Sequence, residues 1–123
     1  MAHREAVIRQ GDVFWVRFAS ERGSEPWGRR PAVVLQHDRF NRTQLNTVVV
    51  LAVTTNLALA GFRGNVRLRK GEANLVQASV VNVTQVQTID RTRLEEKIGS
   101  LTRTRLRQVW EGVRLVVEVN GAD

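Results

Sequence analysis

The stretch GSEPWGRRPAVVLQHD, residues 23–38, places a polar turn directly against an apolar segment. We expect Pro31 to open a strand that continues as AVVLQHD, because proline is tolerated at the first residue of a strand. Two arginines and a tryptophan lie in the turn just before it. The sequence therefore predicts a junction between loop and strand that carries cationic and aromatic side chains close to the protein core.

Alternating or unbroken apolar runs on both sides of this stretch predict a protein built mainly of strands. The run VVVLAVT at 48–54 is unbroken, which is typical of a strand buried on both faces. Further strands are expected at residues 13–18, 65–69, 75–83 and 86–89. Five or six short strands are therefore expected, with turn signals between them.

The end of the chain changes period. Apolar residues recur at helical spacing between 106 and 117, and Thr102 is expected to cap that amphipathic helix. A shorter helical turn is expected in RTRLEEK, between Asp90 and Lys97. Short strands followed by one packed helix predict a single domain over residues 1–123, of α+β class, built as a small and strongly bent antiparallel β-barrel.

Charge and composition narrow the function. Nineteen Lys and Arg stand against twelve Asp and Glu, a formal charge of +7, and the cations are nearly all arginine. This bias indicates a phosphate-bearing partner, although replacement of lysine by arginine on solvated surfaces would give the same composition. Cysteine is absent, which excludes disulfides and thiolate metal ligands. The charged start MAHREAVIRQ and the lack of a long apolar run predict a cytoplasmic protein without a membrane segment.

The usual catalytic groups are scarce. The two histidines, His3 and His37, are far apart in sequence, and a lone histidine at a strand end is more often structural. Neither a Walker-type loop, a GxGxxG motif nor a spaced cluster of metal ligands is present, so no cofactor or metal is expected. Arginine and hydroxyl groups remain, a set suited to stabilising charge on a phosphoryl group without metal.

Four segments in register, GSEPWGRRPAVVLQHDRFN, TVVVLAVTTN, LVQASVVNVTQVQTID and KIGSL, resemble the MazF/PemK family of bacterial toxin endoribonucleases. The resemblance runs from Gly11 to about Val119. It implies an SH3-like barrel with added helices, a homodimer, and neutralisation by a cognate MazE-like antitoxin protein. It also implies metal-independent cleavage of single-stranded RNA, such as messenger RNA, at a short sequence motif.

The resemblance implies a catalytic pair, Arg30 in RRP and Thr54 in AVTTN, although the neighbouring Thr55 is an alternative source of the hydroxyl. Where relatives often carry an acidic residue after the SVV strand, this chain has residues 82–85, NVTQ, and Arg29 doubles the usual arginine. The residues expected to bind RNA are Ser24, Glu25, Trp27, Arg29, Gln36, Asp38, Thr55 and Gln85.

The chemistry that this resemblance implies has a physical basis. When the 2′-OH of RNA attacks the adjacent phosphorus, an anionic phosphorane forms and breaks down to a 2′,3′-cyclic phosphate and a 5′-OH end. Arg30 can place two N–H donors on the oxygens where charge grows, and Thr54 can add a hydroxyl donor. Trp27 can either stack on a base or cap the barrel. Arg30 could instead form an ordinary surface ion pair with Glu25 or Asp38.

Two other functions remain open at this point. A gyrase-poisoning toxin of the same fold would bind a protein and cleave nothing, and a basic SH3-like module could bind RNA without catalysis. Neither alternative requires Arg30 together with Thr54, so this pair distinguishes an endoribonuclease from both.

Overall fold

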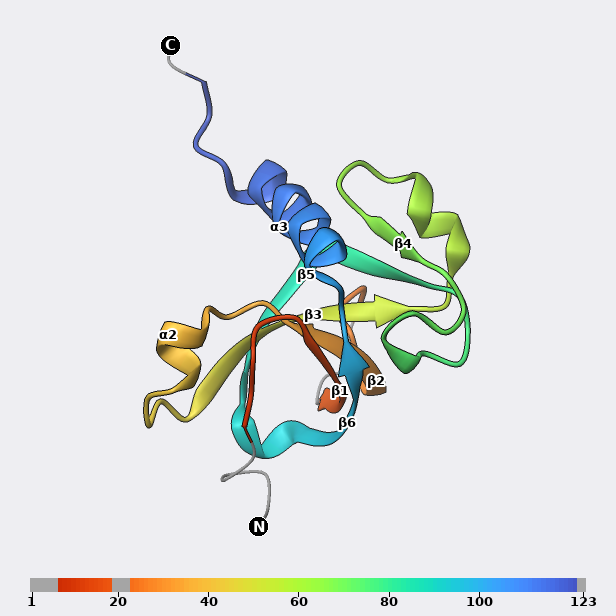
Figure 1. The fold of residues 1–123 in the computed structure, drawn as a ribbon. Coiled ribbons are helices and arrows are strands. Elements are labelled where there is room, and N and C mark those ends of the chain that lie inside the picture. Colours follow the sequence, from red (N-terminus) through yellow and green to blue (C-terminus); the bar gives the residue numbers. More distant parts are fainter. Residues whose placement is uncertain (1–6, 19–22, 122–123) are drawn as a thin grey trace.

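The computed structural model describes residues 7–18 and 23–121, so His3 and most of the charged N-terminal stretch lie outside the described residues. Within them, six antiparallel strands form one sheet in the order β4-β5-β3-β2-β1-β6 (Figure 1). The strands are β1 (Asp12–Phe18), β2 (Gly28–Val34), β3 (Thr47–Thr54), β4 (Val66–Leu68), β5 (Ser79–Asp90) and β6 (Leu94–Ser100). The sheet curls into a half-barrel with β4 and β6 at its edges, which confirms the predicted fold class.

Helical segments connect and cover the strands. The short helix α2 (Asp38–Asn41) follows β2, and the longer helix α3 (Arg103–Val117) ends the fold and lies across β5 (Figure 1). The described residues also include three short 3-10 helices: η1 (Leu57–Gly61), η2 (Glu72–Asn74) and η3 (Arg91–Arg93). The hydroxyl oxygen of Thr102 accepts a hydrogen bond from the Arg105 amide at 3.2 Å, which confirms Thr102 as the cap of α3.

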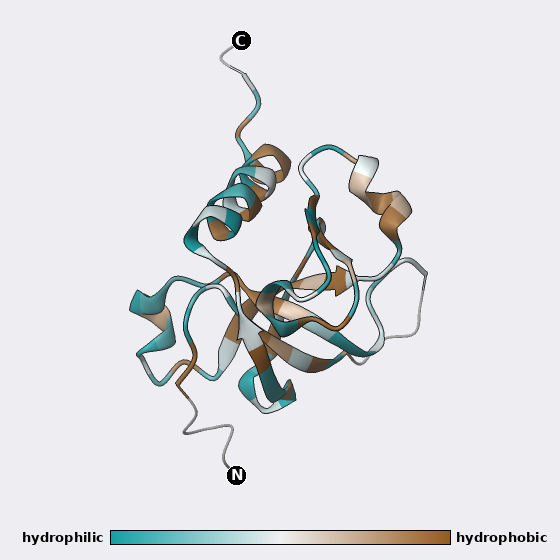
Figure 2. Ribbon diagram, turned by 45° about the vertical axis from the view of Figure 1, so that its right-hand side comes forward, coloured by the Kyte–Doolittle hydropathy of each residue, from teal (hydrophilic) through white to brown (hydrophobic). Residues whose placement is uncertain are grey.

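Two apolar cores hold the curled sheet together. One fills the inside of the curl and includes Phe14, Val16, Ala32, Val34, Val50 and Ala52. The other lies between the sheet and α3 and includes Val33, Leu51, Val53, Val81, Val83, Val109 and Val113. Strands β1, β2 and β3 contribute alternate residues to both cores, because successive side chains point to opposite faces of a strand. Figure 2 shows brown, hydrophobic stretches both in the strands of the sheet and along the C-terminal helix that packs on it.

Helix α3 makes one very close backbone contact, between Gly112 and Gly64 in the segment just before β4. A Cβ atom added to Gly112 would lie 2.1 Å from the carbonyl oxygen of Gly64 and 2.9 Å from a methyl carbon of Val83. Only glycine allows two backbones to approach in this way. Gly112 therefore fixes the height at which α3 sits on the β4–β5 end of the sheet.

Four predicted elements are wrong in detail. Strand β2 begins at Gly28, not at Pro31, and ends at Val34 before the QHD segment. The segments 75–83 and 86–89, predicted as two strands, belong largely to the single strand β5. The predicted helical turn in RTRLEEK is the brief η3 followed by β6, which pairs with β1 and closes that side of the sheet.

Candidate active site

A pocket of about 260 Å³ lies where the loop before β2 meets the end of β3. Its walls come from the loop, from β2, β3 and β5, and from η1. The structure brings six of the sequence-predicted residues together there: Ser24, Glu25, Trp27, Arg30, Thr54 and Gln85. Gly23, Pro26, Ala52, Val53, Leu59 and Asn82 complete the lining.

Arg30 is anchored by one end of its guanidinium. Its Nε donates a hydrogen bond to the carbonyl oxygen of Trp27 at 2.9 Å. Its two terminal nitrogens make no hydrogen bond or ion pair with the described residues. A guanidinium held at Nε keeps a planar pair of donors free, which is the geometry that grips phosphate oxygens. The alternative of a surface ion pair with Glu25 or Asp38 does not occur in the structure.

The turn at Gly28 makes this arrangement possible. Gly28 has a φ of 71°, a left-handed conformation that glycine adopts without steric cost. It lies between Trp27 and Arg30, so the turn brings the Trp27 carbonyl back toward the Arg30 side chain. The Arg30 Cζ lies 5.5 Å from the centre of the Trp27 ring, within the range of a cation–π contact.

Trp27 is half exposed at the mouth of the pocket. The exposed fraction of its surface is 47%, which is too high for a side chain that caps an apolar core. Pro26 beside it is buried and ties the loop to the protein. The ring therefore offers an aromatic face to solvent next to the free end of Arg30, as a stacking platform would require.

The two candidate threonines differ in position. Thr54 ends β3, is partly buried and lines the pocket, whereas Thr55 is exposed and does not line it. The Thr54 Oγ1 accepts a hydrogen bond from the Asn56 amide at 3.1 Å. Because the oxygen accepts this bond, its hydroxyl hydrogen remains available as a donor to a ligand. The geometry thus favours Thr54 over Thr55.

A bulge in β5 supplies the amide side chains of the pocket. Pairing between β3 and β5 shifts register between Leu51 and Val53, where the partner residue changes from Val86 to Val81. The surplus residues on β5 include Asn82 and Gln85, both of which line the pocket. Bulges often re-aim side chains beside active sites. Asn82 was not among the residues predicted to bind RNA, and the bulge that brings it here is set by long-range pairing.

The loop contributes the acidic group. Glu25 is the carboxylate among the described lining residues, and Ser24 beside it adds a hydroxyl. Both residues are exposed, and neither side chain has a partner within the described part of the chain. An unpaired carboxylate close to an arginine and a threonine can accept a proton from a ligand.

Arg29 is not part of this pocket. It neighbours Arg30 on β2 and therefore points to the opposite face of the strand. Its Nε lies 2.6 Å from a Glu95 carboxylate oxygen, and its Cζ lies 4.3 Å from the centre of the Trp15 ring. The sequence alone did not separate the two arginines, because the strand was expected to start only after them.

Gln36 and Asp38 also lie outside the pocket, Gln36 just before α2 and Asp38 at its first residue. The Asp38 carboxylate accepts a hydrogen bond from the Gln10 amide at 2.7 Å, which lowers the pKa of that carboxyl. Gln36 bonds to Asn41 at 3.0 Å and accepts from the Val49 amide at 3.3 Å. These contacts tie the segment after β2 to its neighbours. His37 likewise has a structural role, since its ring nitrogen accepts from the Arg39 amide and caps α2.

Among residues 7–18 and 23–121, no three His, Cys, Asp or Glu side chains converge as a metal site would require. Over the same residues, no helix has both the length and the apolar character to span a membrane.

The sequence and the fold of this chain are similar to those of known proteins. Residues 9–117 match the family described as PemK-like, MazF-like toxin of type II toxin–antitoxin system. The endoribonuclease MazF6 of Mycobacterium tuberculosis is 35% identical over 113 residues, which cover 92% of this chain and 99% of that protein. Relatives of this kind confirm the predicted enzyme class, an endoribonuclease.

Solved structures agree. The crystal structure of MazF from Deinococcus radiodurans is 25% identical with a TM-score of 0.77, covering 93% of this chain and 99% of that one. A MazE–MazF structure from the same organism, 21% identical with a TM-score of 0.71 and covering 94% and 99%, shares the fold. The chain therefore belongs to the family of PemK-like, MazF-like toxins of type II toxin–antitoxin systems.

Proposed function

We propose that this toxin cleaves single-stranded RNA in the pocket around Arg30 and Thr54, by attack of the RNA's own 2′-OH and without a metal ion. The observation that carries the proposal is the free end of the anchored Arg30 guanidinium, in one pocket with the Thr54 hydroxyl. In the reaction the 2′ oxygen bonds to phosphorus and the bond from phosphorus to the 5′ oxygen breaks. The products carry a 2′,3′-cyclic phosphate and a 5′-OH.

Arg30 and Thr54 stabilise the charge that grows during this reaction. The two terminal nitrogens of Arg30 donate to the non-bridging oxygens of the phosphorane, and Thr54 adds its hydroxyl. Both donors are oriented before the substrate arrives, Arg30 by the Trp27 carbonyl and Thr54 by the Asn56 amide. Preorganised donors of this kind do not have to reorient as the transition state forms, which is why they lower its energy.

Glu25 is the group that can accept the proton of the 2′-OH. Guanidinium stays protonated at neutral pH and the threonine hydroxyl is a poor base, so neither catalytic donor can take this proton. Glu25 lies in the same pocket, on the loop that also carries Trp27. The 5′ oxygen takes its proton from water as it leaves.

The remaining lining residues suit recognition of a base. The exposed Trp27 ring can stack on one base face, and the amides of Asn82 and Gln85 present both donors and acceptors to a base edge. Such contacts need an unpaired, splayed base, which favours single-stranded RNA over a duplex. The cleaved sequence motif would then depend on Trp27, Asn82 and Gln85.

A homodimer is the proposed assembly. Apolar side chains remain exposed along the outer side of α3, with Trp110 at 49%, Leu115 at 48% and Val117 at 63% of their full exposure. Grooves of about 1050 and 720 Å³ flank the helix, and neither contains the pair of Arg30 and Thr54. Exposed apolar patches mark interaction surfaces, and two-fold pairing of identical faces is the common way to cover one.

A separate antitoxin protein is the proposed regulator. A MazE–MazF structure is known for a relative that shares this fold. The net charge of +7 and the free guanidinium nitrogens of Arg30 favour an acidic partner segment for this chain as well. We expect that segment to compete with RNA for the pocket around Arg30 and Trp27.

The test is cleavage of a long single-stranded RNA by the purified protein in EDTA, with both new ends mapped. The proposal predicts cyclic phosphate and 5′-OH ends, and no cleavage where the scissile nucleotide lacks its 2′-OH. Arg30→Ala should lower the rate by two to three orders of magnitude, roughly the effect of removing one preorganised donor. RNA that is bound but left intact would favour the non-catalytic RNA-binding module, and inhibition of gyrase without RNA cleavage would favour the gyrase-poisoning toxin.

A further inference from the structure

Two arginines face each other at the base of the loop that leads into the pocket. In the pairing of β1 with β2, Arg17 lies directly opposite Arg29. Side chains at directly opposed positions share one face of the sheet, and like charges placed there repel each other. The next pair along these two strands is Val16 with Arg30, so the repulsion acts directly beside Arg30.

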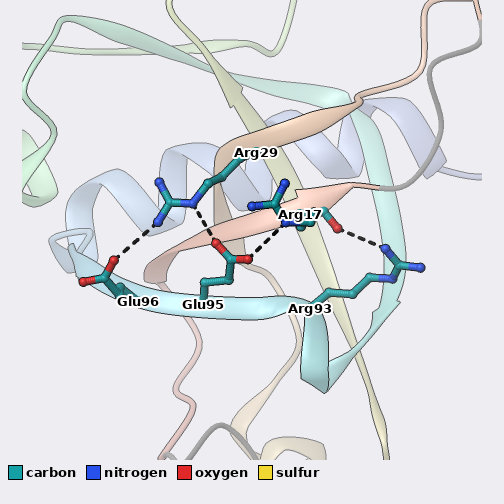
Figure 3. Close-up of polar contacts among 5 residues, drawn as sticks. All are labelled: Arg17, Arg29, Arg93, Glu95 and Glu96. Carbon is teal, nitrogen blue, oxygen red and sulfur yellow. Dashed lines mark hydrogen bonds and ion pairs between the residues drawn. The ribbon is translucent and has the colours of Figure 1, made fainter.

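A single carboxylate from a third strand joins the two arginines. Glu95 of β6 accepts from Arg29 Nε at 2.6 Å through one oxygen and from Arg17 Nε at 3.3 Å through the other (Figure 3). Figure 3 shows its carboxylate lying between the two guanidiniums. The hydrogen bond from Arg29 lowers the pKa of Glu95, so the carboxylate stays charged at neutral pH.

Other contacts hold the same cluster in place. The Arg29 guanidinium stacks on the Trp15 ring, and its Nη2 lies 3.4 Å from the more exposed Glu96. Arg93 donates from Nη1 to the carbonyl oxygen of Arg17 at 3.1 Å (Figure 3). The side chain of Arg29 is therefore fixed on the face of β2 opposite to the pocket.

Strand β2 needs this support near Arg30. Its pairing with β3 covers only Ala32, Val33 and Val34, whereas its pairing with β1 extends back to Gly28. The first half of the strand, including Arg30, therefore has a strand neighbour on one side alone. If that pairing loosened at its end, Arg30 and the Trp27 carbonyl that holds it would move together.

We propose that Glu95 is a positioning residue for catalysis: by bridging Arg17 and Arg29 it keeps the start of β2 paired and so holds Arg30 in the pocket. The inference rests on the proposed role of Arg30. Glu95 touches no substrate and acts through Arg29 and the backbone of β2. Arg29 then contributes to catalysis from the far face of the strand rather than by binding RNA.

The test compares Glu95→Gln with Glu96→Gln. Both changes remove one negative charge from the same strand, so any general gain in RNA attraction is shared. Glu96→Gln leaves the bridge intact and removes only the longer contact of an exposed side chain with Arg29. Glu95→Gln should lower kcat about tenfold, within the range that small misplacements of catalytic groups produce. KM should change less than twofold, and the melting temperature only slightly, because exposed ion pairs add little to global stability. Glu96→Gln should retain wild-type kcat.

A second variant tests the bridge itself. In Glu95→Gln no carboxylate bridges the two arginines, so adding Arg17→Gln, which removes their repulsion, should restore at least part of the lost kcat. A general loss of stability would instead appear as a clear fall in the melting temperature of Glu95→Gln. Arg30→Ala is assayed alongside: if it is inactive while Glu95→Gln keeps wild-type kcat, the positioning role is overturned and the proposed site stands. If Arg30→Ala itself is fully active, the proposed site fails, and the positioning role fails with it.

Discussion

Replacing Gly112 by alanine tests how α3 is docked. The new methyl group would meet the Gly64 carbonyl oxygen at 2.1 Å and its carbonyl carbon at 3.0 Å. The backbone of Gly64 or of α3 therefore has to move. Overpacking costs about 1–3 kcal/mol, and a backbone obstacle places this case at the upper end. Alanine in a helix regains about 1 kcal/mol over glycine. The net loss should be about 2 kcal/mol, or about 6–12 °C in melting temperature for a domain of this size.

The assay is thermal unfolding followed by circular dichroism, at one fixed protein concentration because assembly would shift the midpoint. The matched control is Gly61→Ala, because a methyl group added to Gly61 meets no atom within 4 Å. Its melting temperature should stay within about 2 °C of wild type. If Gly112→Ala melts at or above the wild-type temperature with an unchanged spectrum, the close packing of α3 on Gly64 does not set its position.

Further outcomes concern the site and one ion pair. Arg30→Lys should lower the cleavage rate at least about tenfold, because lysine keeps the positive charge but lacks the paired N–H donors of a guanidinium. Single-turnover cleavage measures this rate. Thr54→Val should slow cleavage about a hundredfold, whereas Thr55→Val should cleave like wild type. Arg105 lowers the pKa of Glu72 through a hydrogen bond. The ion pair of Glu72 with Arg105 therefore contributes to the free energy of unfolding. This contribution is fully present above a pH of about 4.3, the pKa of an unfolded glutamate, and is lost as the pH falls through the lower folded-state pKa. Urea unfolding of Glu72→Gln should therefore show a weaker acid dependence than wild type.

The strands with strong apolar patterns were predictable from the sequence. Strand β3 occurs almost where VVVLAVT predicted it, because its buried residues form a continuous run. Strand β6 was missed because its sequence LEEKIGS has three consecutive charged residues, so no alternating pattern is visible. It lies at the edge of the sheet and pairs with β1 through an irregular register. Its position depends on partners distant in sequence, which local periodicity cannot reveal.

The site was predictable in part, for a related reason. Residues close together in sequence on the loop, such as Ser24, Glu25 and Trp27, do meet Arg30 in the pocket. Gln36 and Asp38 do not, because the chain leaves the sheet after Val34 and turns into α2. A motif places residues along the chain, whereas the pocket depends on where each strand begins and ends.

The doubled arginine shows what a shift of strand boundary changes. While the strand was expected to begin at Pro31, Arg29 and Arg30 belonged to a loop and could both face RNA. Once β2 begins at Gly28, alternation forces them to opposite faces, and the two equal charges acquire different surroundings. Arg29 is neutralised by Glu95 and covered on one side by Trp15, whereas Arg30 keeps two donors without a partner among the described residues. Pairing with β1 thus makes one of two identical neighbours available to a phosphate and commits the other to holding it there.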